Sequence, residues 1–215
     1  MLKKYILLGF AILMTGAIAL DLYSPIKTDF KKFDPVQVGV LDAAMWRSYY
    51  EHKQVKLFFQ LSKLMRSQFH APWLRSYMIS YYSAKAAFVF NKGHDRASYA
   101  KALPYLSAYY QQIEALSDSH FNFLQMAQLE LEWWIIRRES DIHSPEDWKI
   151  VLGHLGETMY SIPANRFATF ADQRVRAMLL RDRKGEMIEE NDWDQIEKIC
   201  VEAWTSFHDV LKSGS

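Results

Sequence analysis

The chain has 215 residues, of which 50% are hydrophobic and 15% aromatic, enough for one folded domain with a substantial core. Its 26 basic residues are nearly balanced by 25 acidic residues, so the formal net charge is +1 and no excess positive field exists to hold a polyanion. Nucleic acid is therefore not expected as a partner. The single cysteine, Cys200, excludes an internal disulfide and is expected to lie buried on an apolar helix face.

The first 20 residues contain a strongly apolar segment. Lys3 and Lys4 precede an uncharged run from Tyr5 to Leu20. As a helix this run spans about 24 Å, slightly less than the roughly 30 Å hydrocarbon core of a bilayer. It would cross the membrane if the helix continued to Tyr23. Because no polar face interrupts the run, it is predicted to be a transmembrane signal-anchor helix and not a helix of the folded core.

A cleaved secretory signal is the alternative interpretation of the same residues. Such signals combine a basic start, a short apolar core and small residues at the cleavage site, here Ala17-Ile18-Ala19. In both cases the basic end stays in the cytoplasm and the remainder is exported. The sequence therefore predicts a bacterial cell-envelope protein. It is anchored in the inner membrane with its domain on the periplasmic side, or it is released into the periplasm after cleavage.

Residues 21–37 separate this segment from the rest of the chain. They contain two prolines, three acidic and three basic residues, and no apolar period. These features are typical of an extended tether. We therefore expect a signal peptide or anchor over 1–20, a tether over 21–37 and a helical domain over 38–213.

From Val38 onward, apolar residues recur at spacings of three and four, which indicates helices, and no alternation with a period of two persists. Capping residues, prolines and glycines divide this pattern into successive segments. The fold class is therefore all-α, with one bundle-like domain of seven or eight helices joined by short loops. Helices are expected at about 38–51, 54–69, 72–91, 121–138, 145–160, 165–183 and 191–213, with Ser119, Ser144 and Asn191 as N-caps of the fifth, sixth and last. The fourth helix is expected to begin at a cap formed by Asp95 or Ser98 and to end near 116, with a kink or restart at Pro104.

Motifs that would indicate a known reaction are missing from the sequence. It contains no Gly-x-Ser-x-Gly, no glycine-rich phosphate loop and no Glu-x-x-His pair of the di-iron bundles. His154 and Glu157 are three residues apart and could face one metal ion, but a solvated helix surface explains them better. No metal site is predicted, the sequence does not identify a cofactor, and an enzyme is less expected than a binding protein.

Ionisable residues mixed with aromatic residues give a candidate ligand site. Arg47 and Glu51 are four residues apart and are expected to pair along one helix, and Glu130 is expected to meet Arg47 or Arg75 across the core. If these groups converge, they form a polar pocket with aromatic walls. The alternative is that the aromatic residues only supply core bulk. The candidate ligand-binding residues are Arg47, Glu51, His70, Arg75, Tyr82, Lys85, Glu130 and Trp134.

Two functions follow from these patterns. The first is an interaction or accessory subunit of the cell envelope, which binds the membrane through an uncleaved N-terminal helix and a protein partner through the helical domain. The second is an amphiphile-binding protein or enzyme, in which arginines hold an anionic head group and Glu51 or Glu130 acts as a general base. The second function requires a carboxyl pKa raised towards neutrality by burial.

Overall fold

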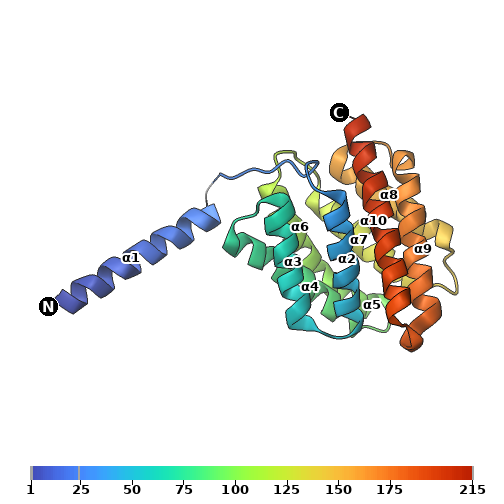
Figure 1. Ribbon diagram of the computed structural model, residues 1–215, viewed down its shortest axis with the longest axis horizontal. Helices are drawn as coiled ribbons and strands as arrows, with labels where there is room; N and C mark the ends of the chain where they lie inside the picture. Colours follow the sequence, from blue (N-terminus) through green and yellow to red (C-terminus); the bar gives the residue numbers. More distant parts are fainter. Residues whose placement is uncertain (1, 24, 215) are drawn as a thin grey trace.

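The structure is a computed structural model that describes residues 2–23 and 25–214. Within these residues the chain is almost entirely helical, and the only β-type pairing described is an isolated bridge between Thr28 and Ser117. Helix α1 (Leu2–Tyr23) stands out from a compact helical body (Figure 1). The prediction of an all-α protein with an apolar N-terminal helix is confirmed.

Eight helices of at least 14 residues form a closed ring. In chain order they are α2 (Pro35–Tyr50), α3 (Gln54–Phe69), α4 (Trp73–Asn91), α6 (Leu103–Leu116), α7 (Phe123–Arg138), α8 (Pro145–Tyr160), α9 (Ala168–Lys184) and α10 (Glu190–Ser213). Each helix packs against the next, and α10 packs against α2, which closes the ring. The short helix α5 (Arg96–Tyr99) and the 3-10 turns η1 (Ala100–Ala102), η2 (Ala164–Phe167) and η3 (Gly185–Met187) lie in the connections.

Closure of the ring depends on a small residue at the contact between its first and last helices. A Cβ atom placed on Gly39 of α2 would lie 2.5 Å from the Cα atom of Val201 in α10. A distance this short involves backbone, so a side chain at Gly39 would push the two helices apart. Ile196, Cys200 and Phe207 of α10 are buried. The buried position predicted for Cys200 is confirmed.

Most helix ends follow from local sequence signals. The Ser144 hydroxyl and the Asp147 carboxylate form a reciprocal capping box at the start of α8, as the sequence predicts. Two predicted caps are wrong. The side chain of Asn122, not Ser119, accepts a hydrogen bond from the backbone of α7. Asn191 lies inside α10, because the Asp192 carboxylate reaches back to the backbone N–H of Glu189 and starts the helix earlier.

Residues 25–34, hereafter the crossing segment, are not a free tether, which corrects part of the predicted domain division. The backbone N–H of Thr28 donates to the carbonyl of Leu116 at 2.8 Å. Phe30 is 5% exposed and stacks on Phe69 with ring centroids 4.7 Å apart. Asp34 then caps α2, so the helical domain begins before residue 38. The segment is extended as predicted, but burial of Phe30 holds it across the end of the ring where α3 and α6 terminate.

Candidate functional site

The predicted ligand-binding residues do not converge on one pocket. Glu51 caps the C-terminal end of α2, next to the start of α3, whereas Arg75 lies just beyond the end of α3, in the first turn of α4. Because α3 has 16 residues, these two side chains start from positions separated by a helix about 24 Å long. Glu130 lies in α7. The proposed pocket is therefore divided into separate places.

The predicted pair of Arg47 and Glu51 is confirmed, with the Arg47 Nε atom 2.9 Å from a Glu51 oxygen. Arg47 also binds both oxygens of Glu190 in α10, at 2.6 and 2.8 Å. This cluster borders a surface cleft of about 360 Å³. Hydrogen bonds from Lys53 and Arg47 lower the pKa of the Glu51 carboxyl. A general base would need the opposite shift, so this environment does not favour the role suggested for Glu51.

Glu130 has the environment that the sequence analysis anticipated but a different partner. Its half-buried carboxylate accepts hydrogen bonds from the Tyr110 hydroxyl at 3.0 Å and from the Trp134 indole N–H at 2.9 Å. Burial raises the pKa of this carboxyl, and the donors together with the positive charge of Arg174 act against that shift. The predicted pairing of Glu130 with Arg47 or Arg75 is wrong, since the guanidinium that acts on it belongs to Arg174 in α9.

Arg174 itself forms a buried ion pair with Asp42 of α2. The indole N–H of Trp204 in α10 donates to the same Asp42 carboxylate at 2.8 Å, and the Arg174 guanidinium lies 4.3 Å from the centroid of the Trp46 ring. These contacts join three helices of the ring. Sequence analysis missed them, although Asp42 lies four residues after buried Val38, a spacing that places an acid on an apolar stripe.

The remaining candidate residues have other neighbours. His70 ends α3 with a positive φ of 50°, a conformation in which the chain turns towards α4. The Tyr82 ring packs against Tyr81, with centroids 5.5 Å apart. Lys85 is exposed, and its amino group lies 5.8 Å from the centroid of the Tyr105 ring. Of the eight predicted residues, the structure brings together Arg47 with Glu51 and Glu130 with Trp134.

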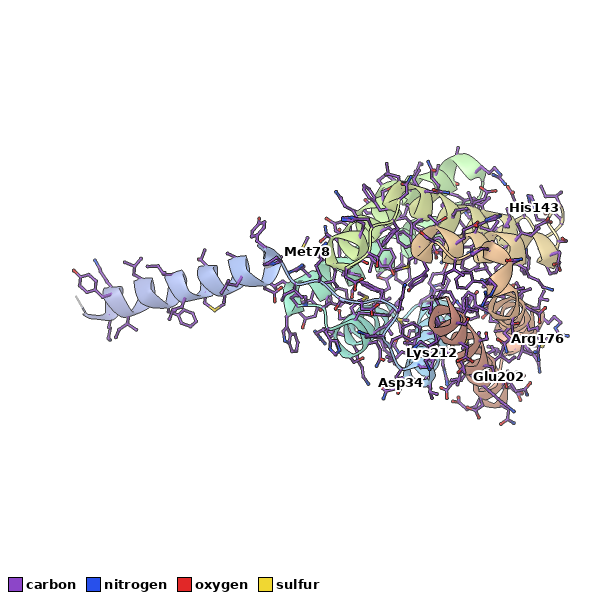
Figure 2. All side chains as sticks on the ribbon, turned by 90° about the horizontal axis from the view of Figure 1, so that it is seen from above. Asp34, Met78, His143, Arg176, Glu202 and Lys212 are labelled. Carbon is purple, nitrogen blue, oxygen red and sulfur yellow. The ribbon has the colours of Figure 1, made fainter. Side chains whose placement is uncertain are left out.

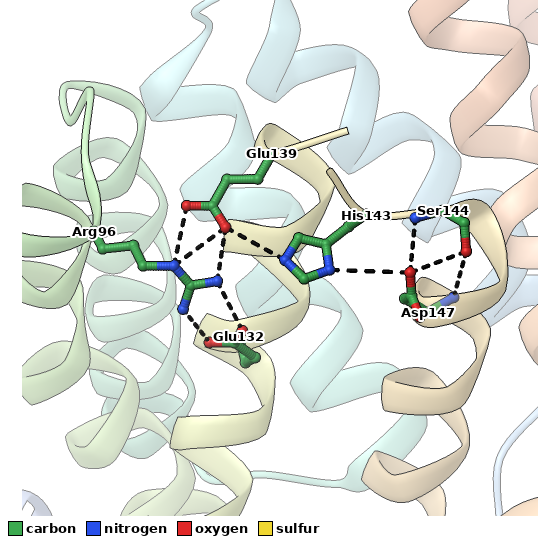
Figure 3. A network of polar contacts seen from close by, with 6 residues as sticks. All are labelled: Arg96, Glu132, Glu139, His143, Ser144 and Asp147. Carbon is green, nitrogen blue, oxygen red and sulfur yellow. Dashed lines mark hydrogen bonds and ion pairs between the residues drawn. The ribbon is translucent and has the colours of Figure 1, made fainter. Parts of the chain in front are cut away.

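A chain of polar contacts links α5, α7 and the start of α8 (Figure 3). Arg96 binds Glu139 at 2.7 Å and Glu132 at 3.2 Å, and His143 lies 3.6 Å from Glu139 and 3.9 Å from Asp147. These side chains lie at the surface, where single ion pairs contribute about 0–1 kcal/mol. The network fastens helix ends together and leaves each of its charges paired with another, so we assign it a structural role.

The last turn of α1 is bound to the start of α4, a contact that sequence analysis missed. One carboxylate oxygen of Asp21 accepts hydrogen bonds from the backbone N–H groups of Leu74 at 3.0 Å and Arg75 at 3.3 Å. The Arg75 Nε atom, on a side chain that is itself buried, donates to the Asp21 carbonyl at 2.9 Å. An acid from outside α4 thus caps its positive N-terminal end. We call these contacts the α1–α4 joint.

Before that joint, residues 3–20 of α1 are exposed. The apolar window within Lys3–Tyr23 has a mean hydropathy of 2.0 and is 0% buried. The span Lys3–Tyr23 has 21 residues, which correspond to about 31 Å of helix. By length and composition this is enough to cross a bilayer. A signal sequence has the same properties, whereas a core helix would be covered by the rest of the chain.

Comparison with known proteins found no matching family model, curated protein or solved structure.

Proposed function

We propose that the chain is a membrane-anchored cell-envelope protein whose helical ring acts as a non-catalytic interaction or accessory subunit. The observation that carries this proposal is the α1–α4 joint. Asp21 lies in the last turn of the apolar helix and at the same time caps α4 of the ring. The helix that is long enough to cross a membrane is thereby connected to the domain through a defined set of hydrogen bonds.

The same joint favours retention of α1 over cleavage. Helix α1 runs without a break through the candidate cleavage residues 17–19 and ends at Tyr23. Cleavage after Ala19 would leave Asp21 on a stub of four helical residues, too short to hold a helical turn by its own hydrogen bonds. The intact helix supplies the rigid turn on which the carboxylate of Asp21 is presented to α4.

Two further observations support a binding role over catalysis by the predicted pocket. Glu51, one of the two proposed general bases, has a lowered pKa because Lys53 and Arg47 donate to it. Glu130 has a raised pKa but lies apart from the arginines that were expected to hold an anionic head group. The geometry therefore supports an accessory subunit better than an amphiphile-handling enzyme.

Membrane extraction of the full chain tests the anchor. We expect the protein to remain in the membrane after washing at high pH and high salt, and the intact mass of the purified chain to include α1. A mature N-terminus at Leu20, or release of the protein by the wash, would contradict the proposal.

The accessory role is tested on the same preparation in mild detergent. We expect the mass of the purified particle to exceed that of one chain with its detergent, because a partner remains bound. A strictly monomeric particle with no second chain would count against the role of an interaction subunit and would leave the anchor unaffected.

A further inference from the structure

The charge of the chain is unevenly distributed around the ring. From His52 to His94 there is no aspartate or glutamate, whereas this stretch contains seven lysine and arginine residues. The rest of the chain then has 19 basic residues against 25 acidic ones. The stretch corresponds to the hairpin formed by α3 and α4, so a nearly neutral protein carries one helical hairpin of a single sign. Its basic residues are Lys53, Lys56, Lys63, Arg66, Arg75, Lys85 and Lys92.

Not all of this charge is available to a binding partner. Lys53 and Lys56 line the surface cleft that also contains Glu190 and Glu197 of α10, so carboxylates of the chain itself face them. Arg75 belongs to the α1–α4 joint. Lys63 and Lys85 are exposed, and Arg66 is half-buried, away from that cleft.

The same hairpin exposes large aromatic side chains. Phe59 of α3 is 54% exposed, and Trp73 and Tyr81 of α4 are 60% and 52% exposed. Phe59 and Lys63 are four residues apart on α3, and Trp73, Tyr81 and Lys85 follow one another at multiples of four on α4. Side chains four residues apart share one face of a helix, and over longer separations such a stripe turns gradually around it. Each helix of the hairpin thus presents aromatic and basic side chains together on its exposed face.

Arg66 joins the two helices within this surface. Its guanidinium carbon lies 3.9 Å from the centroid of the Trp73 ring and 5.3 Å from that of Tyr77. The Arg66 Nη1 atom is buried, and among the described residues it has no hydrogen-bond acceptor. Arg66 therefore holds the Trp73 ring against α3 through a cation–π contact and adds a positive charge to this surface.

This surface lies where α1 leaves the ring. Trp73 immediately precedes Leu74, whose N–H group is bound by Asp21 at the end of α1. Figure 1 shows α1 extending sideways from the flank that contains α3 and α4, and Figure 2 places Met78 of α4 beside the domain end of α1. When α1 crosses a bilayer, this flank faces the headgroups of the leaflet from which α1 emerges.

We infer that the exposed face of the α3–α4 hairpin is a lipid-binding surface that lies on anionic phospholipids around α1. The lipid face, as we call it, consists of Phe59, Lys63, Arg66, Trp73, Tyr77, Tyr81 and Lys85. Tryptophan and tyrosine are favoured at the level of the headgroups, and lysine and arginine bind the lipid phosphates there. This inference depends on the proposed function, because it requires α1 in the membrane.

A lipid occupant is favoured over a protein occupant by two properties of this surface. It is continuous with the α1–α4 joint, so the bilayer is already beside it once α1 is inserted. Its charges are of one sign and are mixed with aromatic rings. That combination matches a layer of anionic headgroups over an apolar interior, whereas protein interfaces commonly pair charges of both signs.

Tryptophan fluorescence of the full chain in lipid nanodiscs tests the inference. Among the seven tryptophans Trp73 alone is strongly exposed, and α1 contains none. Discs are prepared from phosphatidylcholine and phosphatidylglycerol, with either ordinary or brominated acyl chains. We expect lower emission in the brominated discs, and we expect Trp73→Phe to remove most of that difference. Equal emission in both kinds of disc, with the protein still bound to them, would overturn the lipid face and leave the anchor intact.

Other outcomes of this experiment are distinct. A chain that does not remain with the discs after a high-salt wash would contradict the proposed function itself. If a second protein co-purifies and shields Trp73 from iodide in detergent, the surface is a protein interface and the lipid face is wrong. If Trp73→Phe leaves the bromine effect unchanged, another tryptophan contacts lipid and the assignment of the hairpin fails.

Discussion

The α3–α4 hairpin and α10 belong to the same ring, but their outer surfaces differ in chemistry. Helix α10 carries six acidic residues and two lysines, and none of its large hydrophobic side chains is exposed. The hairpin has no acidic residue and exposes Phe59, Trp73 and Tyr81. Both use their inner faces to build the core. The composition of each outer face therefore matches its surroundings. These are water for α10 and, in our proposal, lipid for the hairpin.

We expect the hairpin and α10 to unfold together as one cooperative unit. A substitution at Phe30 of the crossing segment tests this expectation. Phe30 packs on residues of α3, α4 and α6. Phe30→Ala removes a buried ring and should lower the free energy of unfolding by about 3–5 kcal/mol. Urea unfolding followed by circular dichroism should show a single transition at lower urea. Two separate transitions would mean that the hairpin and α10 unfold independently.

The buried pair of Asp42 and Arg174 contacts α10 through Trp204. Substitution of Arg174 tests whether an unpaired charge is tolerated inside the ring. Arg174→Met leaves the Asp42 carboxylate buried with Trp204 as its remaining donor. Loss of one partner of a buried pair costs about 3–5 kcal/mol. Arg176→Met on the same helix, at an exposed position, is the matched control and should change stability by less than about 0.5 kcal/mol. Equal losses for the two variants would refute the assigned role of the pair.

Glu130 is a carboxyl group on the inner side of the ring, in contrast to the outward acids of α10. Burial raises its pKa, so between the ordinary value of 4.5 and the raised value the folded chain holds a proton that the unfolded chain has released. The stabilisation from this proton is fully present below pH 4.5 and is lost as the pH rises through the raised pKa. For one group the slope is at most about 1.4 kcal/mol per pH unit.

Glu130→Gln removes this titration. The free energy of unfolding of the variant minus that of the wild type should therefore increase as the pH rises through that range. Urea unfolding at a series of pH values measures the difference. Glu132→Gln, at the surface of the same helix, is the matched substitution, and the larger change in the pH profile of stability is expected from Glu130→Gln. A wild-type profile parallel to that of Glu130→Gln would show that Glu130 does not titrate in the folded protein as described.

The smallest effects on stability are expected from substitutions of exposed lysines. These substitutions distinguish the two surfaces, because only those on the hairpin should change lipid binding. Lys63→Gln with Lys85→Gln removes two charges from the lipid face, and Lys198→Gln with Lys212→Gln removes two from α10. Both double variants should unfold within about 0.5 kcal/mol of the wild type. Only the hairpin variant should reduce the quenching of Trp73 by brominated lipid. Equal quenching in both variants would show that these hairpin lysines do not bind headgroups.

Local signals allowed much of the fold to be predicted from the sequence. The predicted helix at 54–69 coincides with α3, and the restart at Pro104 is confirmed by η1 followed by α6. The crossing segment was not recognised as part of the domain, because an extended stretch without a period does not reveal that one of its aromatic rings is buried. The N-cap of the last helix was placed two residues too late, at Asn191, because the cap is formed by the reciprocal contacts of Glu189 and Asp192.

The candidate site was predictable only in part. An acid among aromatic residues drew attention to Glu130, and its contact with Trp134 lies within one helix. Its cationic neighbour, Arg174, lies 44 positions further along the chain in α9 and depends on how the ring closes. The α1–α4 joint could not be predicted for the same reason, because Asp21 and Leu74 are 53 residues apart in the sequence. Contacts between distant helices follow from packing, which periodicity alone does not encode.

The sideways direction of α1 determines how an anchored domain would meet other molecules. The helices of the ring run across the direction of α1 (Figure 1), so the axis of the ring would lie along the membrane surface. The two ends of the ring would then point along the bilayer, and the crossing segment lies across one of them. Figure 1 places α10 on the opposite side of the ring from α1, so its acidic outer surface would be the one that meets proteins arriving from the aqueous phase.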